Sequence, residues 1–228
     1  MAEQLPFALP VLSDFGEHAY LIADSNQQAV AWVERWPDWP GRRLLLAGPA
    51  GGGKSHLAAI WADRAAAGRC QASSLRADRD IAGACSGGSW LVEDLGGLAD
   101  ERGLLHLVNA VAERGGHLLL TADRPVAQLD LRLPDLRSRL LTFAVAELLP
   151  PDDALLAGVL WKLFADRQLL VTDGLVRFLV RRMPRSLAAA GRLVAELDRM
   201  ALAKGRPVNR AMAREALAME AERQTMDP

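Results

Sequence analysis

Residues 48–55 read GPAGGGKS and match the phosphate-binding pattern G-x-x-x-x-G-K-[ST]. The octapeptide follows an apolar run, residues 44–47, and precedes a helical pattern, residues 54–67. Glycines let backbone N–H groups converge on phosphate oxygens, and the helix adds the positive end of its dipole. We therefore predict a strand–loop–helix phosphate site rather than an ordinary glycine-rich turn. Its candidate binding residues are Gly48, Pro49, Ala50, Gly51, Gly52, Gly53, Lys54, which contacts the β- and γ-phosphates, and Ser55, which ligates Mg²⁺.

The sequence around this loop alternates between two patterns. Short apolar runs are typical of buried strands, and the segments between them have apolar residues at helical spacing. Such alternation predicts an α/β fold with a doubly wound parallel sheet that helices cover on both faces. The expected strands are residues 44–47, 70–75, 90–92, 117–121 and 142–146, and the expected helices are residues 25–36, 54–67, 104–114 and 134–140.

After residue 150 the pattern is helical throughout. Asp152 and Asp153 suit the start of a helix that runs to about residue 168, and Thr172 suits the start of the next. Two further helices fit residues 186–204 and 209–221, and we expect residues 222–228 to be a frayed end. The predicted division is a tail at 1–12, a nucleotide-binding α/β domain at 13–150 and a small all-α domain at 151–228.

Charge and composition exclude several classes of protein. The 27 basic and 28 acidic residues give a net charge of −1, and half of the residues are hydrophobic, so we expect a globular protein and not a dedicated nucleic-acid binder. No apolar run approaches the roughly 18 residues that cross a bilayer, and the N-terminus lacks a signal-peptide pattern, so we expect a cytoplasmic protein with no membrane partner. The two cysteines, Cys70 and Cys85, predict neither a disulfide framework nor a zinc site.

The acidic pair Glu93–Asp94 follows the apolar run at 90–92. We expect this run to lie beside the P-loop strand, where carboxylates at the carboxyl end hold Mg²⁺ and polarise an attacking water. Glu93 and Asp94 are therefore candidate metal-binding and catalytic residues. Two acids that cap the following loop are the alternative.

The segment 118–140, LLLTADRPVAQLDLRLPDLRSRL, carries a family resemblance. Its stretches 123–125 (DRP), 133–136 (LPDL) and 138–139 (SR) resemble the sensor 1 and arginine-finger region of the DnaA-related AAA+ proteins. Within that family the chain is most similar to the Hda-type regulatory inactivators of the replication initiator DnaA. Further matches are Ser25–Asn26, the sequence GKSHL at 53–57, and Arg185 at the start of an expected helix.

The resemblance implies an AAA+ P-loop NTPase fold with a small all-α lid domain. It implies that Asp123 is the sensor 1 residue, that His56 belongs to the nucleotide site, and that Arg139 is an arginine finger for a neighbouring subunit's nucleotide. It also implies that Arg185 is the sensor 2 arginine, although Arg181 or Arg182 could serve equally, and a turn cap is the alternative for Asp123. The family's usual Asp–Glu order is reversed in Glu93–Asp94, so we expect weak intrinsic ATPase at most.

Residues 4–10 read QLPFALP. They are similar to the short peptide with which Hda-type proteins bind the hydrophobic cleft of the DNA polymerase sliding clamp. In this reading Gln4 offers an amide while Leu5, Phe7 and Leu9 fill the groove. A tail that folds onto its own domain is the alternative.

Together these features predict a regulator that holds ADP or ATP with Mg²⁺. Tethered to a DNA-loaded sliding clamp, it docks on ATP-bound DnaA and promotes hydrolysis there, with Arg139 acting in trans. It meets DNA only through the clamp, and a homo-oligomer is among the expected assemblies. The initiator continues past its lid into a DNA-binding domain whereas this sequence stops, so we expect the regulator and not the initiator. A self-contained ATPase such as a helicase loader, and an adaptor with a structural nucleotide, are the alternatives.

Overall fold

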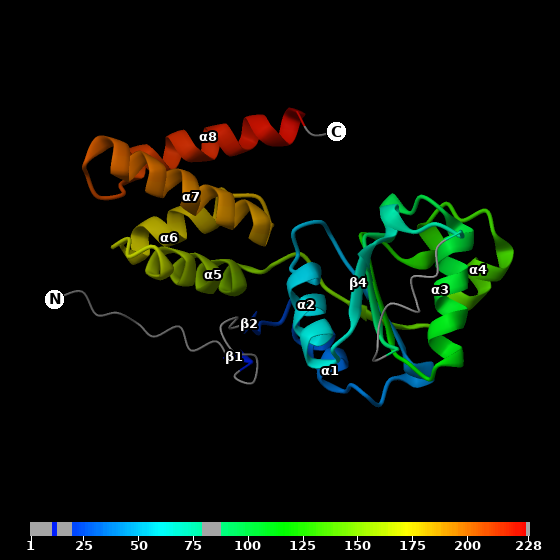
Figure 1. The fold of residues 1–228 in the computed structure, drawn as a ribbon. Coiled ribbons are helices and arrows are strands. Elements are labelled where there is room, and N and C mark those ends of the chain that lie inside the picture. The colour runs from blue at the N-terminus through cyan, green and yellow to red at the C-terminus, as the bar shows by residue number, and fades with distance from the viewer. Residues whose placement is uncertain (1–10, 13–19, 79–87, 227–228) are drawn as a thin grey trace. The chain divides into compact units, whose positions relative to one another are not determined.

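The computed structural model describes residues 11–12, 20–78 and 88–226 (Figure 1). Its contacts divide the chain into two compact units. One unit is Asn26–Leu149, and the other combines the described residues up to Ser25 with those from Pro150 onward.

The Asn26–Leu149 unit contains a five-stranded parallel sheet in the order β4-β5-β6-β3-β7. Leu45 on β3 stands opposite Leu120 on β6 and Val145 on β7. The expected doubly wound α/β fold is thus confirmed. The strands are β3 (Arg43–Ala47), β4 (Gly68–Gln71), β5 (Trp90–Glu93), β6 (Leu118–Ala122) and β7 (Ala144–Glu147).

Two features of the sheet differ from the sequence prediction. β6 lies between β5 and β3, so the strand that ends at Glu93 is not the neighbour of the P-loop strand. Strand neighbours depend on where each helical crossover returns the chain, which local pattern does not encode. In addition, β4 ends at Gln71, and residues 72–74 form the short helix η2 (Ala72–Ser74), where the Ser74 hydroxyl donates to the Gln71 carbonyl at 2.7 Å.

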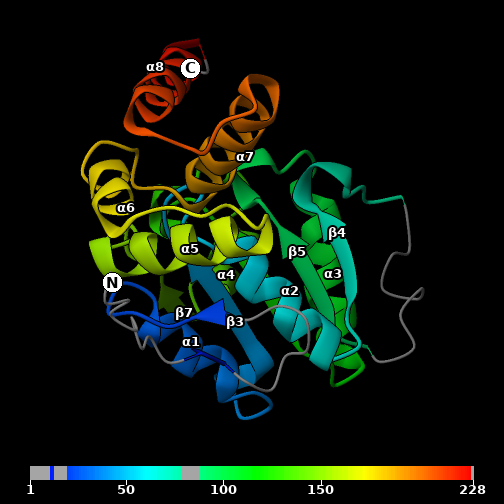
Figure 2. The same ribbon diagram turned by 90° about the vertical axis from the view of Figure 1, so that its left-hand side faces the viewer.

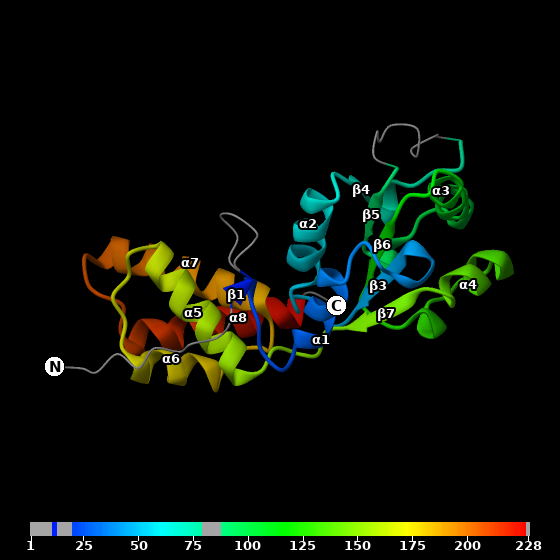
Figure 3. The ribbon, with the colours of Figure 1, turned by 90° about the horizontal axis from the view of Figure 1, so that it is seen from below.

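Helices cover both faces of this sheet (Figure 3). α1 (Gln27–Glu34) and α2 (Lys54–Arg64) lie on one face, and α3 (Glu101–Glu113) and α4 (Pro134–Leu140) on the other. On the α3 face, Trp90 and Val92 of β5 pack with Leu104 and Leu107 of α3 in one buried cluster. Burial on both sides explains why the strands read as continuous apolar runs.

The other unit is mainly helical, and side chains fix its helix starts as the sequence predicts. Asp152 caps α5 by accepting the Leu155 N–H at 2.7 Å. Thr172 and Ser186 cap α6 and α7 in the same way. The helices are α5 (Asp153–Asp166), α6 (Asp173–Val180), α7 (Leu187–Lys204) and α8 (Arg210–Met226) (Figure 2). They pack around buried residues that include Leu160, Phe164 and Leu193.

Residues 20–25 belong with these helices and not, as the predicted division has it, with the α/β domain. β1 (Val11–Leu12) pairs antiparallel with β2 (Tyr20–Leu21), and β2 contacts α5. The Ser25 N–H donates to Asp152 Oδ2 at 3.1 Å. This hydrogen bond and those from Leu155 and Ala154 hold the pKa of Asp152 below its ordinary value, although burial acts to raise it.

α8 runs to Met226, so the expectation of a frayed end from residue 222 is wrong for residues 222–226. Glu220 is buried within α8, and its carboxylate accepts Arg192 Nε of α7 at 3.1 and 3.2 Å. Arg223 approaches the same carboxylate at 3.8 Å. These contacts lie near the C-terminal end of α8. In the part of the chain that the structure describes, no helix is long and apolar enough to cross a bilayer.

Candidate nucleotide site

The loop between β3 and α2 has a backbone path that requires glycine. A Cβ on Gly48 would lie 2.4 Å from the Leu148 carbonyl oxygen. At this distance no residue with a side chain fits unless the backbone shifts. Gly51 (φ 70°) and Gly53 (φ 101°) adopt left-handed conformations that L-residues with side chains disfavour. The glycines of the sequence motif therefore serve the geometry of a phosphate loop.

The N-terminus of α2 faces this loop without a competing acid. Gly53 is its N-cap residue, no described side chain caps it, and its first turn contains no Asp or Glu. The starts of α1 and α4 also lack a side-chain cap, whereas Asp100, Asp152, Thr172 and Ser186 cap α3, α5, α6 and α7. An uncapped helix start with its positive dipole end suits an anionic phosphate. Ser55 and His56 lie in this first turn and are exposed.

Lys54 folds back over the loop. Its Nζ donates to the Gly48 carbonyl at 2.7 Å and to the Pro49 carbonyl at 2.9 Å. Burial lowers the pKa of the half-buried ammonium, while the negative charges of Asp123 and Asp94 act in the opposite direction. The ammonium of Lys54 and the carboxylates of Asp94 and Asp123 are thus close enough to interact electrostatically.

Asp94 and Asp123 come together from the ends of β5 and β6. A Cβ on Gly96 would lie 3.4 Å from an Oδ1 atom of each aspartate, which places both carboxylates at that glycine. Asp94 has a left-handed backbone (φ 59°), and its N–H donates to the buried Thr121 hydroxyl of β6 at 2.9 Å. The Thr121 bond links the two strand ends, so the sheet itself positions this pair of acids.

The three predicted acids have different partners. Arg124 donates to both oxygens of Asp123, at 3.0 and 2.5 Å, and this pairing holds the pKa of Asp123 below its ordinary value. Glu93 instead accepts a hydrogen bond from Gln71 of the adjacent β4 at 3.4 Å. The sequence predicted no role for Gln71, Thr121 or Arg124, although Thr121 and Arg124 lie within the segment 118–140 that carries the family resemblance.

The donors around the loop fit a magnesium ion that is shared with phosphate. Among the described residues, no three His, Cys, Asp or Glu side chains are arranged to hold a metal. Mg²⁺ usually keeps several waters and takes only one or two carboxylates beside substrate phosphates. The Ser55 hydroxyl and the carboxylates of Asp94 and Glu93 are oxygen donors of the kind that such an ion takes.

The two other predicted functional arginines lie on different units. Arg139 is on α4, where its Nε donates to Asp135 Oδ1 at 3.2 Å and 39% of its side chain is exposed. Arg185 is in the helical unit, just before the start of α7, and forms an ion pair with Asp153. The guanidinium of Arg182 lies 4.3 Å from the Phe178 ring centroid. The tail residues Gln4, Leu5, Phe7 and Leu9 fall outside the described residues.

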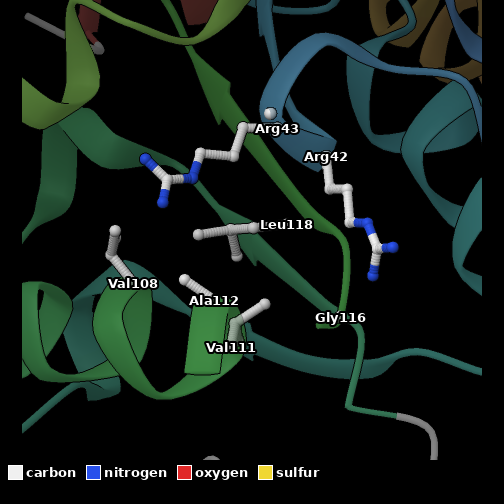
Figure 4. A pocket seen from close by; sticks show the side chains of 8 residues that line it. Arg42, Arg43, Val108, Val111, Ala112, Gly116 and Leu118 are labelled. Atoms are coloured by element: carbon white, nitrogen blue, oxygen red, sulfur yellow. The ribbon is translucent and has the colours of Figure 1, made fainter. Parts of the chain in front are cut away.

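A separate cavity of about 290 Å³ lies at the other ends of the strands (Figure 4). Figure 4 shows Arg43 extending across it toward the α3 side chains Val108 and Ala112. Arg42 donates to the Gly115 carbonyl. None of the predicted site residues that the structure describes lines this cavity.

Comparison with known proteins places this geometry in a known fold. No protein-family model matches the chain. Domain III of the replication initiation protein DnaA from Thermotoga maritima superimposes with a TM-score of 0.75 at 18% identity, over 87% of this chain and 93% of that one. The chain has an AAA+ P-loop NTPase fold.

Two other solved structures support this assignment. AMPPCP-bound DnaA from Aquifex aeolicus gives a TM-score of 0.64 at 15% identity, over 90% of this chain and 68% of that one. The RuvB Holliday junction branch migration motor of Thermotoga maritima gives 0.64 at 18% identity, over 78% of this chain and 61% of that one. At these identities the likeness to DnaA and RuvB concerns the AAA+ fold, and the chain spans less than two thirds of the RuvB length.

Proposed function

We propose that the chain is a nucleotide-binding regulator that inactivates the replication initiator by promoting hydrolysis of the initiator's bound ATP. The single observation that carries this proposal is the placement of Arg139. It lies on α4, which covers the opposite sheet face from α2, the helix that begins at the P-loop (Figure 3). A half-exposed cation on that helix can enter a neighbour's nucleotide site and neutralise developing phosphoryl charge there.

The chain's own site holds ADP or ATP in this proposal. Backbone N–H groups of the P-loop and the ammonium of Lys54 bind the phosphates, and Ser55 with Asp94 or Glu93 holds Mg²⁺. The AMPPCP ligand of the similar Aquifex aeolicus structure supports an adenine nucleotide. When bound, Mg²⁺ bridges phosphate oxygens and neutralises their charge. In this proposal Asp123, whose charge acts on Lys54, is the sensor 1 residue, and Arg185 of the helical unit is the sensor 2 residue.

The partners in this proposal are the initiator DnaA and the DNA sliding clamp. Gln4, Leu5, Phe7 and Leu9 anchor the chain to the clamp, and DNA is met only through the clamp. The protein acts in the cytoplasm in this proposal. Copies of the chain also associate into a homo-oligomer. The tail sequence and the fold shared with DnaA domain III support these assignments.

The isolated chain should hydrolyse ATP slowly, below about 1 s⁻¹. Glu93 is bound to Gln71, and the Glu–Asp order is the reverse of the family's usual one, so water activation in the chain's own site is poor. Steady-state phosphate release at saturating ATP and Mg²⁺ measures this rate. Turnover typical of an enzyme would instead favour a self-contained machine such as a helicase loader.

Deletion of residues 1–10 should abolish clamp binding and leave the melting temperature nearly unchanged. A peptide anchor contributes side chains to the partner's groove but few buried contacts to its own domain. Surface-bound clamp measures the first effect and differential scanning fluorimetry the second. Glu3→Ala, adjacent to the anchor, is the control that should bind normally. A large drop in melting temperature after deletion would mean that the tail packs on the protein's own core.

A further inference from the structure

The carboxylate of Glu101 holds two consecutive backbone N–H groups that lie far from it in sequence. Its Oε1 accepts the Arg132 N–H at 2.9 Å, and its Oε2 accepts the Leu133 N–H at 2.6 Å. Each oxygen thus takes one bond, and a charged acceptor makes both bonds stronger than neutral ones. The contact joins the first turn of α3 to the residues just before α4.

α4 depends on this contact more than a longer helix would. It has only seven residues and begins with Pro134, and no described side chain caps it at its N-cap residue Leu133. Leu136 and Leu140 are buried and hold its inner side to the core, while Arg139 remains partly exposed. A helix this short is not stable by itself, so its orientation is set by its anchors.

Glu101 is itself firmly placed. Asp100, one residue earlier, caps α3 by accepting the N–H groups of Arg102 at 2.9 Å and Gly103 at 3.2 Å. Its other oxygen accepts the Ala77 N–H at 2.8 Å. The short helix η4 (Leu95–Gly97) connects Asp94 to this region, with the Gly97 N–H bonded to the Asp94 carbonyl at 3.0 Å. The chain therefore runs from the end of β5, where Asp94 of the candidate nucleotide site lies, to Glu101, which holds the start of α4.

We propose that Glu101 is a positioning residue that fixes the start of α4 and thereby aims Arg139. This inference rests on the proposed function, because Arg139 matters only if it acts on a partner's nucleotide. The role proposed for Glu101 requires no contact with nucleotide or partner. It acts through two backbone hydrogen bonds on the helix that carries the arginine finger.

The test compares Glu101→Ala and Glu101→Gln with Glu113→Ala, an exposed glutamate at the other end of α3. Hydrogen–deuterium exchange over residues 131–140 reports the anchor directly. Single-turnover hydrolysis of initiator-bound ATP, with clamp and DNA present and the chain titrated, reports its consequence. Misplacement of a group by about 1 Å costs up to about a hundredfold in rate.

We expect Glu101→Ala to speed exchange over 131–140 and to lower the rate at saturating chain by about ten- to a hundredfold. The half-saturating concentration and the chain's ADP affinity should stay within about twofold, a split that general unfolding would not produce. Glu101→Gln keeps one acceptor oxygen, so its exchange over 131–140 and its rate should fall between those of Glu101→Ala and the wild type. Glu113→Ala should match the wild type in both. Wild-type exchange over 131–140 in Glu101→Ala would overturn the inference. If exchange rises while both this variant and Arg139→Ala stimulate fully, the anchor exists but the proposed function fails.

Discussion

Replacement of Arg139 by Ala should lower the stimulated hydrolysis of initiator-bound ATP by about 10³-fold or more. An arginine finger stabilises charge that develops only in the transition state, so its loss affects rate and spares binding. The Arg139→Ala protein should therefore bind nucleotide, clamp and initiator with near-normal affinity. The measurement is the single-turnover rate at a saturating concentration of the variant.

The Arg139→Ala substitution should have little effect on the stability of the fold. Arg139 forms only an exposed pair with Asp135 on the same helix, and such pairs contribute about 0.3–0.5 kcal/mol. Arg137→Ala is the matched control, because Arg137 is an exposed arginine on the same helix. It should stimulate normally. Full stimulation by Arg139→Ala would remove this residue from the catalytic account and favour an adaptor with a structural nucleotide.

Replacement of Lys54 by Ala should weaken ADP binding by about ten- to a hundredfold. The lost contact is a charge-assisted hydrogen bond to phosphate, which is worth about 1.5–3 kcal/mol. The variant also loses the two bonds from Nζ to the Gly48 and Pro49 carbonyls, so the loop itself becomes less ordered. Isothermal titration calorimetry with ADP and Mg²⁺ measures the affinity.

Two control variants distinguish the loss of a lysine at this site from the loss of a positive charge in general. Lys162→Ala removes an exposed lysine that pairs with Asp166 on α5 and should leave ADP affinity unchanged. Lys54→Arg keeps the charge but replaces a compact ammonium with a planar guanidinium, and it should restore only part of the affinity. Unaltered ADP binding by Lys54→Ala would show that the nucleotide site has been assigned to the wrong loop.

Features that depend on local sequence were predictable. The phosphate loop follows from its glycines and Lys54, and the helix starts at Asp152 and Thr172 follow from side chains that cap their own helix. The parallel sheet follows from apolar runs that need cover on both faces.

Features that depend on pairing between distant residues could not be predicted from the sequence. The insertion of β6 between β5 and β3 reflects the path of the helical crossovers. The Thr121 bond to the Asp94 backbone and the Gln71 bond to Glu93 arise from strand neighbours and register. Glu101 binds backbone N–H groups, which have no residue-type signature and so leave no pattern in the sequence.

In the proposed function this chain accelerates ATP hydrolysis on the initiator. The most direct test of this acceleration is an initiator preloaded with labelled ATP and freed of excess nucleotide, mixed with the chain, ADP, and a clamp loaded on DNA. The labelled ATP should be converted to ADP rapidly only when the chain and the loaded clamp are both present. Conversion at the initiator's own slow rate in the complete mixture, with a chain that binds both nucleotide and clamp, would contradict it.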